Sequence, residues 1–590
     1  MLDRTNINTL WGSLIIEELR RLGVDYFVIS PGSRSTPLTV AVARNSGVHH
    51  IIVYDERGAA FHALGYGRAT GKPAALICTS GTATANYLPA IVEAAQEAIP
   101  LIAITADRPP ELRDTAANQT IQQPGVYSHY VRWSFDLPAP DLRIPPTMVL
   151  TTVDQLWHRS VGHDPGPVHL NCMFREPLAP VPGKIPAKYL QPLQRWMDKD
   201  HPYTRYRLSP LMPSDDDIRQ VKTALLRARR GLLVLGWTGY PHPNPALHTL
   251  ITRLNWPVFA DIRSGYRMAS PKRPIIFYFD QLLHARSLQR KLRIDTILHV
   301  GRPVTSKRFL QWLDAYPPEQ YIHIAPGPER QDPVHRITLR LQASITHFVE
   351  RLTQTEIPVR PSPILEWLID QSQAIDQFLR KSLETDSLNE VTVARMIATY
   401  IPPEHALFVG NSMPIRDLDM FAPPADKCLP VEGNRGASGI DGLIATAAGY
   451  AAGAGKPVTL LLGDLSLIHD MNSLLQLASL PHPVILVVIN NHGGGIFQFL
   501  PIARFPEVFE RFFLTPHELT FQKLAEFTGL EYQKPTTLAA FQQVYTEALQ
   551  KKRSCIIEVE TQHADYRRLL ERLGQFIDQL EKTLTRCAIK

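Results

Sequence analysis

The sequence lacks an apolar run of the ~18 to 20 residues that a membrane-spanning helix needs. Its first residues, MLDRTNINTLWGS, also lack the basic-then-apolar plan of a signal peptide. Both absences predict a cytoplasmic protein with no membrane segment. The chain has 590 residues, of which 44% are hydrophobic and 20% charged. This composition is typical of globular proteins, and the length predicts about three or four domains.

Cysteine is scarce and scattered. No two of the five cysteines form a CxxC pair; they are Cys78, Cys172, Cys428, Cys555 and Cys587. This spacing argues against structural zinc and against a disulfide framework. We therefore expect free, buried thiols.

Tracts of one charge are also missing. The 62 Lys and Arg are spread among 56 Asp and Glu, which leaves a net charge of +6. This distribution predicts small anionic ligands at least as well as nucleic acid, and we expect no nucleic-acid partner. No GxGxxG motif follows the strands predicted in the middle of the chain, which argues against a dinucleotide site there.

The strongest pattern that is present is a pair of short apolar runs at 458–462 and 484–489. Both are bounded by Pro and Gly, which is typical of strands buried on both faces of a parallel sheet. The helix-like spacing of apolar residues in 465–480 makes the whole a predicted βαβ unit. Asp464 and Asn491 would then follow the carboxyl ends of two parallel strands, where open α/β sheets bind ligands.

A carboxylate and an amide oxygen at this edge, beside the backbone carbonyls of 492–495, suit an oxygen-ligated Mg²⁺ that also holds phosphates. An ordinary Rossmann-like sheet with plain turn residues is the alternative. GD followed by NN at this spacing resembles the diphosphate and metal motif of thiamine-diphosphate enzymes. The resemblance implies three metal ligands, namely the side chains of Asp464 and Asn491 and the carbonyl of Gly493. It also places Leu465 and Ser466 at the cofactor, although most of the superfamily has Gly in place of Leu465.

Alternating strand and helix patterns predict three α/β domains with mainly parallel sheets. Proline-rich passages at 177–213 and 356–363 separate them, because proline cannot continue a helix or a central strand. We expect the domains at 1–185, 214–355 and 364–590. The resemblance implies that they are Rossmann-like pyrimidine, central and diphosphate domains.

In the first two domains, short apolar runs predict nine strands. They lie at 26–30, 51–54, 74–78, 101–105, 168–171, 231–236, 257–261, 296–301 and 321–325. An amphipathic helix is expected at 9–23, closed by Gly23.

In thiamine-diphosphate enzymes, a Glu at the end of a first-domain strand bonds the aminopyrimidine ring and shifts it to an imino tautomer, so that the cofactor deprotonates itself. The resemblance assigns this catalytic role to Glu56, which follows a predicted strand and precedes a small-residue helix. Asp55 is the alternative carboxylate, and a simple helix N-terminal charge is the alternative role. The small-residue turn 79–86 resembles the turn beside the pyrimidine.

Two loops ahead of the metal motif are predicted to meet the phosphates. In 410–416 a Ser hydroxyl and backbone N–H groups are available, and in 433–442 the glycines let the backbone approach an anion at a helix N-terminus. A plain helix start is the alternative. The expected cofactor contacts are Ser412, Gly436, Ser438, Gly439 and Ile440, the last as a wedge that keeps the cofactor bent.

Several segments sharpen the resemblance, including SPGSRSTPL, ITADRPPELRDTAANQTI, GNSMPIRDLD, NRGASGIDG, GDLSLIHDMNSLL and NNHGGGIF. They are similar to the 2-succinyl-5-enolpyruvyl-6-hydroxy-3-cyclohexene-1-carboxylate synthases of menaquinone and phylloquinone biosynthesis, in which the Leu at 465 is expected. This family is a group of transferases that decarboxylate 2-oxoglutarate and add the remaining unit to isochorismate, with thiamine diphosphate and Mg²⁺ or Mn²⁺. The resemblance also implies a homodimer or homotetramer.

Both substrates are dicarboxylates, so several Arg or Lys are expected. The substrate residues implied by motif are Ser33, Arg34, Arg108, Asn118, Gln119, Lys307, Arg308, Arg416 and Arg435, with Ile496 and Phe497 as an apolar wall. Two alternatives stay open. One is a sister thiamine-diphosphate enzyme, such as an acetolactate-synthase-like carboligase or a simple 2-oxoacid decarboxylase. The other is a non-catalytic binding protein that kept the fold. We expect His469 and His492 to be structural.

Overall fold

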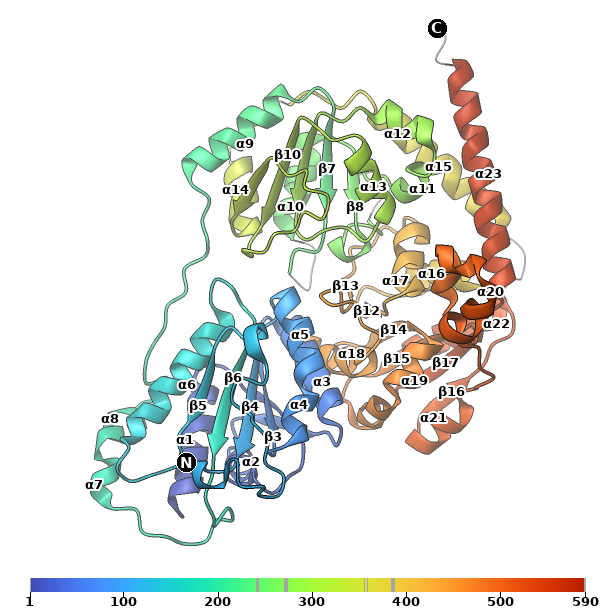
Figure 1. The fold of residues 1–590 in the computed structure, drawn as a ribbon. Helices are drawn as coiled ribbons and strands as arrows, with labels where there is room; N and C mark the ends of the chain where they lie inside the picture. The colour runs from blue at the N-terminus through green and yellow to red at the C-terminus, as the bar shows by residue number, and fades with distance from the viewer. Residues whose placement is uncertain are drawn as a thin grey trace. The chain divides into compact units, whose positions relative to one another are not determined.

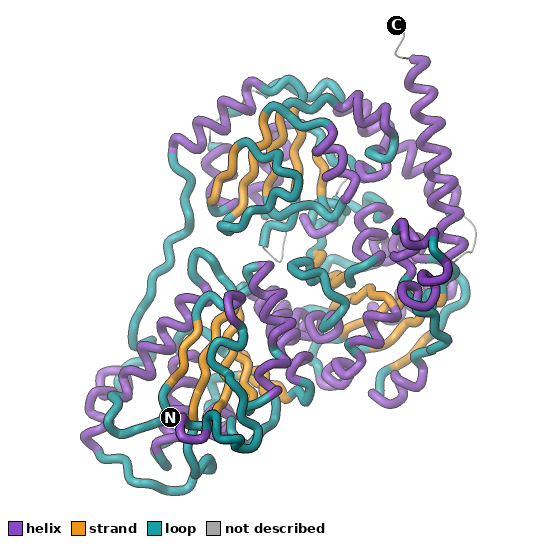
Figure 2. The backbone as a smooth tube through the Cα atoms, viewed as in Figure 1, coloured by secondary structure: helices purple, strands orange, loops and turns teal. Residues whose placement is uncertain are grey.

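The computed structural model describes residues 2–239, 244–269, 274–354, 356–357, 359–383 and 388–587. The strands in these residues form three sheets, and each strand pairing between them is parallel. Figure 2 shows helices flanking the strands of each sheet. The predicted α/β class with mainly parallel sheets is confirmed.

The first sheet has the strand order β2-β1-β3-β4-β6-β5. Its strands are β1 (Tyr26–Ile29), β2 (His49–Ile52), β3 (Ala74–Cys78), β4 (Leu101–Asp107), β5 (Ser134–Leu137) and β6 (Pro167–Met173). Its helices are α1 (Ile7–Arg21), α2 (Thr36–Ala43), α3 (Glu56–Thr70), α4 (Thr82–Asn86), α5 (Leu88–Glu97) and α6 (Pro146–Val161). The predicted end of α1 is confirmed, because Gly23 has φ 85° and its N–H donates to the carbonyl of Arg20.

The second sheet has the order β11-β10-β9-β7-β8. Figure 1 labels its strands β7, β8 and β10. Its strands are β7 (Gly231–Leu235), β8 (Val258–Ala260), β9 (Thr296–Val300), β10 (Gln320–Ala325) and β11 (Leu339–Gln342). The helices are α9 (Asp215–Arg227), α10 (Pro245–Leu254), α11 (Phe279–Leu282), α12 (Arg286–Leu292), α13 (Lys307–Ala315) and α14 (Ile345–Thr353). Four of these strands were predicted, whereas the edge strand β11 was not.

The third sheet has the order β13-β12-β14-β15-β17-β16. Its strands are β12 (Ala406–Val409), β13 (Val431–Glu432), β14 (Val458–Gly463), β15 (Val484–Asn490), β16 (Glu531–Gln533) and β17 (Cys555–Glu560). The helices of this part include α15 (Leu365–Ser382), α16 (Glu390–Tyr400), α17 (Met413–Phe421), α18 (Leu443–Ala454), α22 (Leu538–Gln550) and α23 (His563–Cys587). β14 and β15 run parallel with Gly463 opposite Ile489, so the predicted βαβ pairing is confirmed.

The connection between β14 and β15 differs from the single helix that was predicted. It consists of α19 (Asp464–His469) and a 3₁₀ helix, η5 (Met471–Ser479). The break falls at Asp470, whose carboxylate accepts the N–H groups of Ile444 and Ala445 at the start of α18 and the hydroxyl of Ser473. A tertiary capping contact therefore interrupts the helical pattern.

The chain divides into two compact units that cut across the expected boundaries. The first comprises Met1–Ser209, Asn434–Gly455 and His469–Pro481, and the second comprises the rest. The proline-rich passage after 177 belongs in part to the first unit, because Leu193 and Trp196 are buried in its core. The domain limits at 185, 214, 355 and 364 remain predictions.

Three of the cysteines are buried free thiols, as expected, but Cys428 is exposed because it lies in an irregular segment between α17 and β13. The side chain of Cys587 lies outside the described residues. Across the described parts of the chain, no helix combines the length and apolarity needed to cross a bilayer.

Within the first unit, α3 and α18 pack with their backbones unusually close. A Cβ on Gly449 would lie 1.8 Å from the carbonyl oxygen of His62, and a Cβ on Gly65 would lie 2.0 Å from that of Thr446. Glycine is needed at both positions because the facing atoms are backbone. The small-residue patterns in both helices thus have a packing role.

Gly449→Ala should destabilise the protein by ~1 to 3 kcal/mol, because the added methyl group overpacks a backbone contact. The thermal unfolding midpoint of the variant measures this effect. Gly574→Ala in α23 is the matched control, since its Cβ would lie 3.7 Å from the nearest atom. Equal midpoints for both variants would contradict the close approach of α3 and α18.

Candidate active site

The predicted metal residues gather at the carboxyl edge of the third sheet. Asp464 follows β14 directly and Asn491 follows β15. The N–H of Gly493 donates to Asp464 Oδ2 at 2.9 Å, and the N–H of Leu465 donates to Oδ1 at 2.6 Å. Asp464 is buried, and burial raises the pKa of its carboxyl above the usual value. A carboxylate in such a place is stabilised by a bound cation.

His517 is a residue of this edge that the sequence did not reveal. Its Nε2 lies 3.3 Å from Asp464 Oδ2. The N–H of Leu519 donates to Nδ1 at 3.2 Å, so Nε2 is the ring nitrogen that faces the carboxylate. His517 lies in an irregular stretch without a motif, so no sequence signal marks it. His492 instead contacts the carbonyl of His517 and Glu560, in keeping with a structural role.

Glu56 begins α3, in the first unit. The neighbouring Asp55 caps this helix, because its carboxylate accepts the N–H groups of Arg57 and Gly58 and also a hydrogen bond from Asn472. Glu56 has no such capping role, and its Oε2 lies 3.5 Å from Asn86 Nδ2. Of the two carboxylates, Glu56 is therefore the one left to contact a ligand.

The loop before α18 already has anionic partners. The N–H groups of Gly436 and Ala437 donate to the carboxylate of Glu93 at 2.8 and 2.6 Å. Asp470 occupies the N-terminus of α18 itself. The expected cofactor contacts Ser438, Gly439 and Ile440 follow in the same loop, and Ser438 and Ile440 are exposed. Arg435 precedes them and is half-buried.

The substrate residues predicted in the first unit gather around Ser80. The guanidinium of Arg108 donates to the Ser80 hydroxyl, and Gln119 Nε2 donates to the Ser80 carbonyl at 2.9 Å. The N–H of Arg34 donates to the neighbouring Thr79 hydroxyl at 3.3 Å. Burial lowers the pKa of Arg108, and the charge of Arg34 lowers it further. The loops that follow β1, β3 and β4 thus bring the two cations Arg34 and Arg108 together.

Two predicted substrate residues lie outside that group. Ser33 and Asn118 are exposed. The carbonyl of Ser33 accepts the N–H of Thr36, and the carbonyl of Asn118 accepts the Thr120 hydroxyl.

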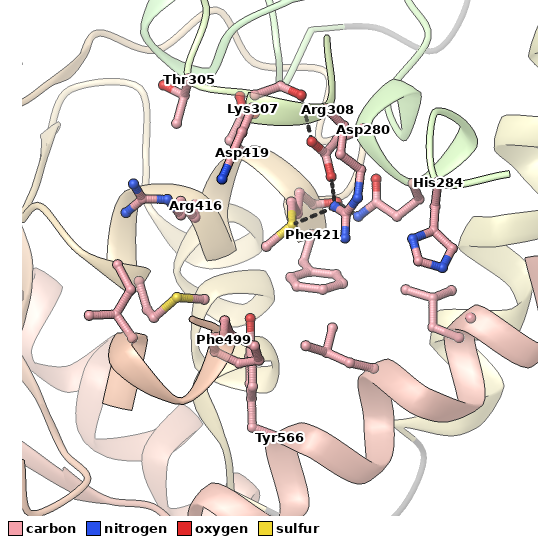
Figure 3. Close-up of a pocket in the computed structure, with 18 of the residues that line it drawn as sticks. Asp280, His284, Thr305, Lys307, Arg308, Arg416, Asp419, Phe421, Phe499 and Tyr566 are labelled. Atoms are coloured by element: carbon pink, nitrogen blue, oxygen red, sulfur yellow. Dashed lines mark hydrogen bonds and ion pairs between the residues drawn. The ribbon is translucent and has the colours of Figure 1, made fainter. Parts of the chain in front are cut away.

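The second unit holds a cavity of about 520 Å³, within the ~300 to 1,000 Å³ of small-molecule sites (Figure 3). Lys307 and Arg308 of α13 and Arg416 of α17 line one side of it. Ile496, in the turn that follows the metal residues, also lines it. Apolar lining comes from Met413, Met420, Phe421, Phe499, Leu500, Leu570, Leu573 and Ile577. The cavity therefore combines cations with an apolar surface.

Two predicted residues, Ser412 and Phe497, adjoin cavity-lining residues in sequence but have other contacts. The ring of Phe497 packs edge to face on Phe513, with centroids 5.7 Å apart. Ser412 precedes α17 with φ 69°, and its hydroxyl does not cap the helix. Its carbonyl accepts the guanidinium of Arg416.

Asp280 of α11 is a further residue that the sequence did not reveal. Its carboxylate accepts the hydroxyl of Ser306 at 2.5 Å and the guanidinium of Arg308 (Figure 3). Ser306 in turn caps α13 through the N–H of Phe309. Asp280 is 4% exposed, so it is a buried counter-charge for Arg308. It comes from a region with no recognisable motif.

Three family models match the chain. They are the N-terminal TPP binding domain of thiamine pyrophosphate enzymes at residues 11–126, the middle domain of thiamine pyrophosphate enzymes at 187–409, and the C-terminal TPP binding domain of these enzymes at 427–559. They cover strands of each of the three sheets, but β5 and β6 of the first sheet lie between the first two matches.

Curated relatives match along nearly the whole chain. A protein of Rubrobacter xylanophilus is 44% identical over 94% of this chain and 96% of its own length. Relatives in Prosthecochloris aestuarii and Salinibacter ruber are 41% and 40% identical, each over 98% of this chain and 99% and 98% of their own lengths. All three are named 2-succinyl-5-enolpyruvyl-6-hydroxy-3-cyclohexene-1-carboxylate synthase. The chain therefore belongs to the thiamine pyrophosphate enzymes and, among them, to the family of these synthases.

Proposed function

We propose that this protein is a thiamine-diphosphate-dependent transferase that decarboxylates 2-oxoglutarate and adds the succinyl-semialdehyde unit to isochorismate in 1,4 fashion. The products are 2-succinyl-5-enolpyruvyl-6-hydroxy-3-cyclohexene-1-carboxylate and CO₂. The observation that carries this proposal is the 44% identity over 94% of the chain to a synthase of that name. The relatives do not favour the alternative of an acetolactate-synthase-like carboligase or simple decarboxylase.

The cationic cavity supports the same substrates. Both are dicarboxylates, and Lys307, Arg308 and Arg416 place three positive groups around one cavity. A guanidinium pairs with a carboxylate through two parallel N–H donors. In the first unit Arg34 and Arg108 provide two more cations. We propose that these groups hold the substrate carboxylates.

When bound, thiamine diphosphate would supply the nucleophilic carbon and the electron sink that decarboxylation of a 2-oxo acid requires. Glu56 would hold the aminopyrimidine ring through a hydrogen bond and set its tautomer. Asp464, Asn491 and the carbonyl of Gly493 would ligate Mg²⁺ or Mn²⁺, which anchors the diphosphate. Ser412 and the 436–440 loop would contact the parts of the diphosphate and the thiazolium ring that the metal does not hold. Ile496 would contact the apolar part of the substrate.

We also propose that the protein acts in the cytoplasm as a homodimer or homotetramer, with neither nucleic acid nor membrane as a partner. Light scattering of the purified protein with cofactor present tests the assembly. A measured mass equal to that of one chain would exclude both the homodimer and the homotetramer.

The reaction is tested by measuring CO₂ release from 2-oxoglutarate and from pyruvate, each with and without isochorismate, in the presence of thiamine diphosphate and Mg²⁺. We expect release from 2-oxoglutarate, accelerated by isochorismate, together with the adduct in the mass spectrum. Faster release from pyruvate, with no isochorismate adduct, would instead indicate a sister enzyme.

Asp280→Asn should raise KM for isochorismate about threefold to tenfold, or ~1 kcal/mol, because Arg308 loses a charged hydrogen-bond partner. Steady-state kinetics at saturating 2-oxoglutarate measures this change. Asp314→Asn on α13 is the control, since Asp314 is exposed and pairs with Arg336. An unchanged KM in Asp280→Asn would show that Arg308 does not depend on Asp280.

A further inference from the structure

A glycine forms part of the wall of the cationic cavity. α23 lines one side with Leu570, Leu573, Gly574 and Ile577. Leu573 and Ile577 are buried, and Gly574 between them is half-buried. The face of α23 that lines the cavity therefore lacks a side chain at one position, Gly574.

Local packing does not require glycine at this position. A Cβ on Gly574 would meet a single atom within 4 Å, the Nε2 of His284 at 3.7 Å, which is an ordinary van der Waals contact. Its backbone is not left-handed. Glycine inside a helix is less stable than alanine, so neither crowding nor strain explains it. The missing side chain leaves the wall of the cavity indented at Gly574, beside His284, and we call this indentation the recess.

α23 is held in place by contacts on both sides of Gly574. The hydroxyl of Tyr566 donates to the buried carboxylate of Asp417 at 2.6 Å. Farther along the helix, the ring of Phe576 stacks on Phe378 of α15, with centroids 4.4 Å apart. Gly574 therefore lies in a stretch of α23 that is packed against other elements at both ends.

The recess has a polar group of its own. The imidazole of His284 lies beside α23 (Figure 3). Burial lowers the pKa of His284, and the charge of Arg308 lowers it further, so the ring is mainly neutral at pH 7. Asp280 and Asp578 are the carboxylates that oppose this shift. A neutral imidazole exchanges hydrogen bonds with hydroxyl groups, whereas the cations of the cavity suit carboxylates.

We infer that Gly574 and His284 determine which acceptor the cavity takes. The cations on α13 and α17 bind the carboxylates, and the recess over Gly574 admits the uncharged edge of the acceptor ring. The product named for the relatives carries a hydroxyl on a cyclohexene ring, and His284 is placed to hydrogen-bond such a group. This inference rests on the proposed function.

The test is to fill the recess in a protein that still folds. Gly574→Leu should raise KM for isochorismate at least tenfold and KM for 2-oxoglutarate less than threefold, with an unfolding midpoint no lower than that of wild type. Gly574→Ala should give a smaller rise in the same direction. His284→Phe keeps an aromatic ring at this position but removes the nitrogen atoms that can hydrogen-bond. This variant should raise KM for isochorismate about fivefold. Gln575→Leu places the same side chain on the exposed face of α23 and should change neither KM.

A folded Gly574→Leu variant with KM for isochorismate within twofold of wild type would overturn the inference. Equal rises in both KM values would also overturn it, because they would indicate a general disturbance of the active site. The wild-type assay separates this failure from failure of the proposed function. If the wild-type protein forms no adduct from isochorismate, the proposed function is wrong. If it forms the adduct but Gly574→Leu leaves the KM for isochorismate unchanged, only the role of the recess is rejected.

Discussion

Glu56→Gln is expected to bind thiamine diphosphate with nearly the affinity of the wild type but to lower kcat by about two to four orders of magnitude. The amide keeps the shape of the carboxylate but is a poor acceptor for a proton or a strong hydrogen bond. Because Asp55 is engaged in capping α3, it is not available to replace Glu56. Single-turnover CO₂ release, with cofactor binding measured on the same sample, separates chemistry from affinity.

Glu111→Gln is a suitable control for this experiment. Glu111 is an exposed carboxylate of the first unit that pairs with Arg175, and its replacement should leave kcat unchanged. If Glu56→Gln turned over at a rate near that of wild type, Glu56 would have no part in activating the cofactor.

Asp464→Ala is expected to raise the Mg²⁺ concentration for half-maximal activity at least tenfold, and to weaken cofactor binding with it. The variant loses a metal ligand and also the acceptor for the Gly493 N–H, which joins the two turns at the edge of the third sheet. Losses of about 10- to 100-fold are typical even for the residues that support metal ligands. Titration of activity with Mg²⁺ at saturating cofactor measures the shift.

Asp370→Ala removes an exposed carboxylate on α15 and serves as the matched variant in the same unit. Its Mg²⁺ dependence should equal that of the wild type. The same Mg²⁺ dependence in a folded Asp464→Ala protein would remove Asp464 from the metal site. Thermal unfolding of both variants shows whether loss of the Gly493 contact has disrupted the fold.

The central strands were predictable because their sequences carry the periodicity of a sheet buried on both faces. β14 and β15 are continuous apolar runs. The strands that escaped prediction are mostly short edge strands. β13 has two residues and β16 has three, with partly exposed side chains in β16. β17 begins with the three apolar residues Cys555, Ile556 and Ile557, and this shorter signal identifies it in retrospect.

The candidate site was predictable where a short motif holds its residues together. Asp464 and Gly493 come from one βαβ unit, and strand register fixes their separation. His517 and Asp280 were not predictable, because contacts distant in sequence bring them to Asp464 and Arg308. The capping of α18 by Asp470 is a contact of the same kind.

Saturable binding of thiamine diphosphate is the most direct test of the account. We expect calorimetric titration of the purified protein in Mg²⁺ to show one site per chain, with affinity falling sharply when the metal is chelated. A protein that is folded, supplied with Mg²⁺ or Mn²⁺, and still takes up no thiamine diphosphate would contradict the assignment of both Glu56 and the Asp464 edge.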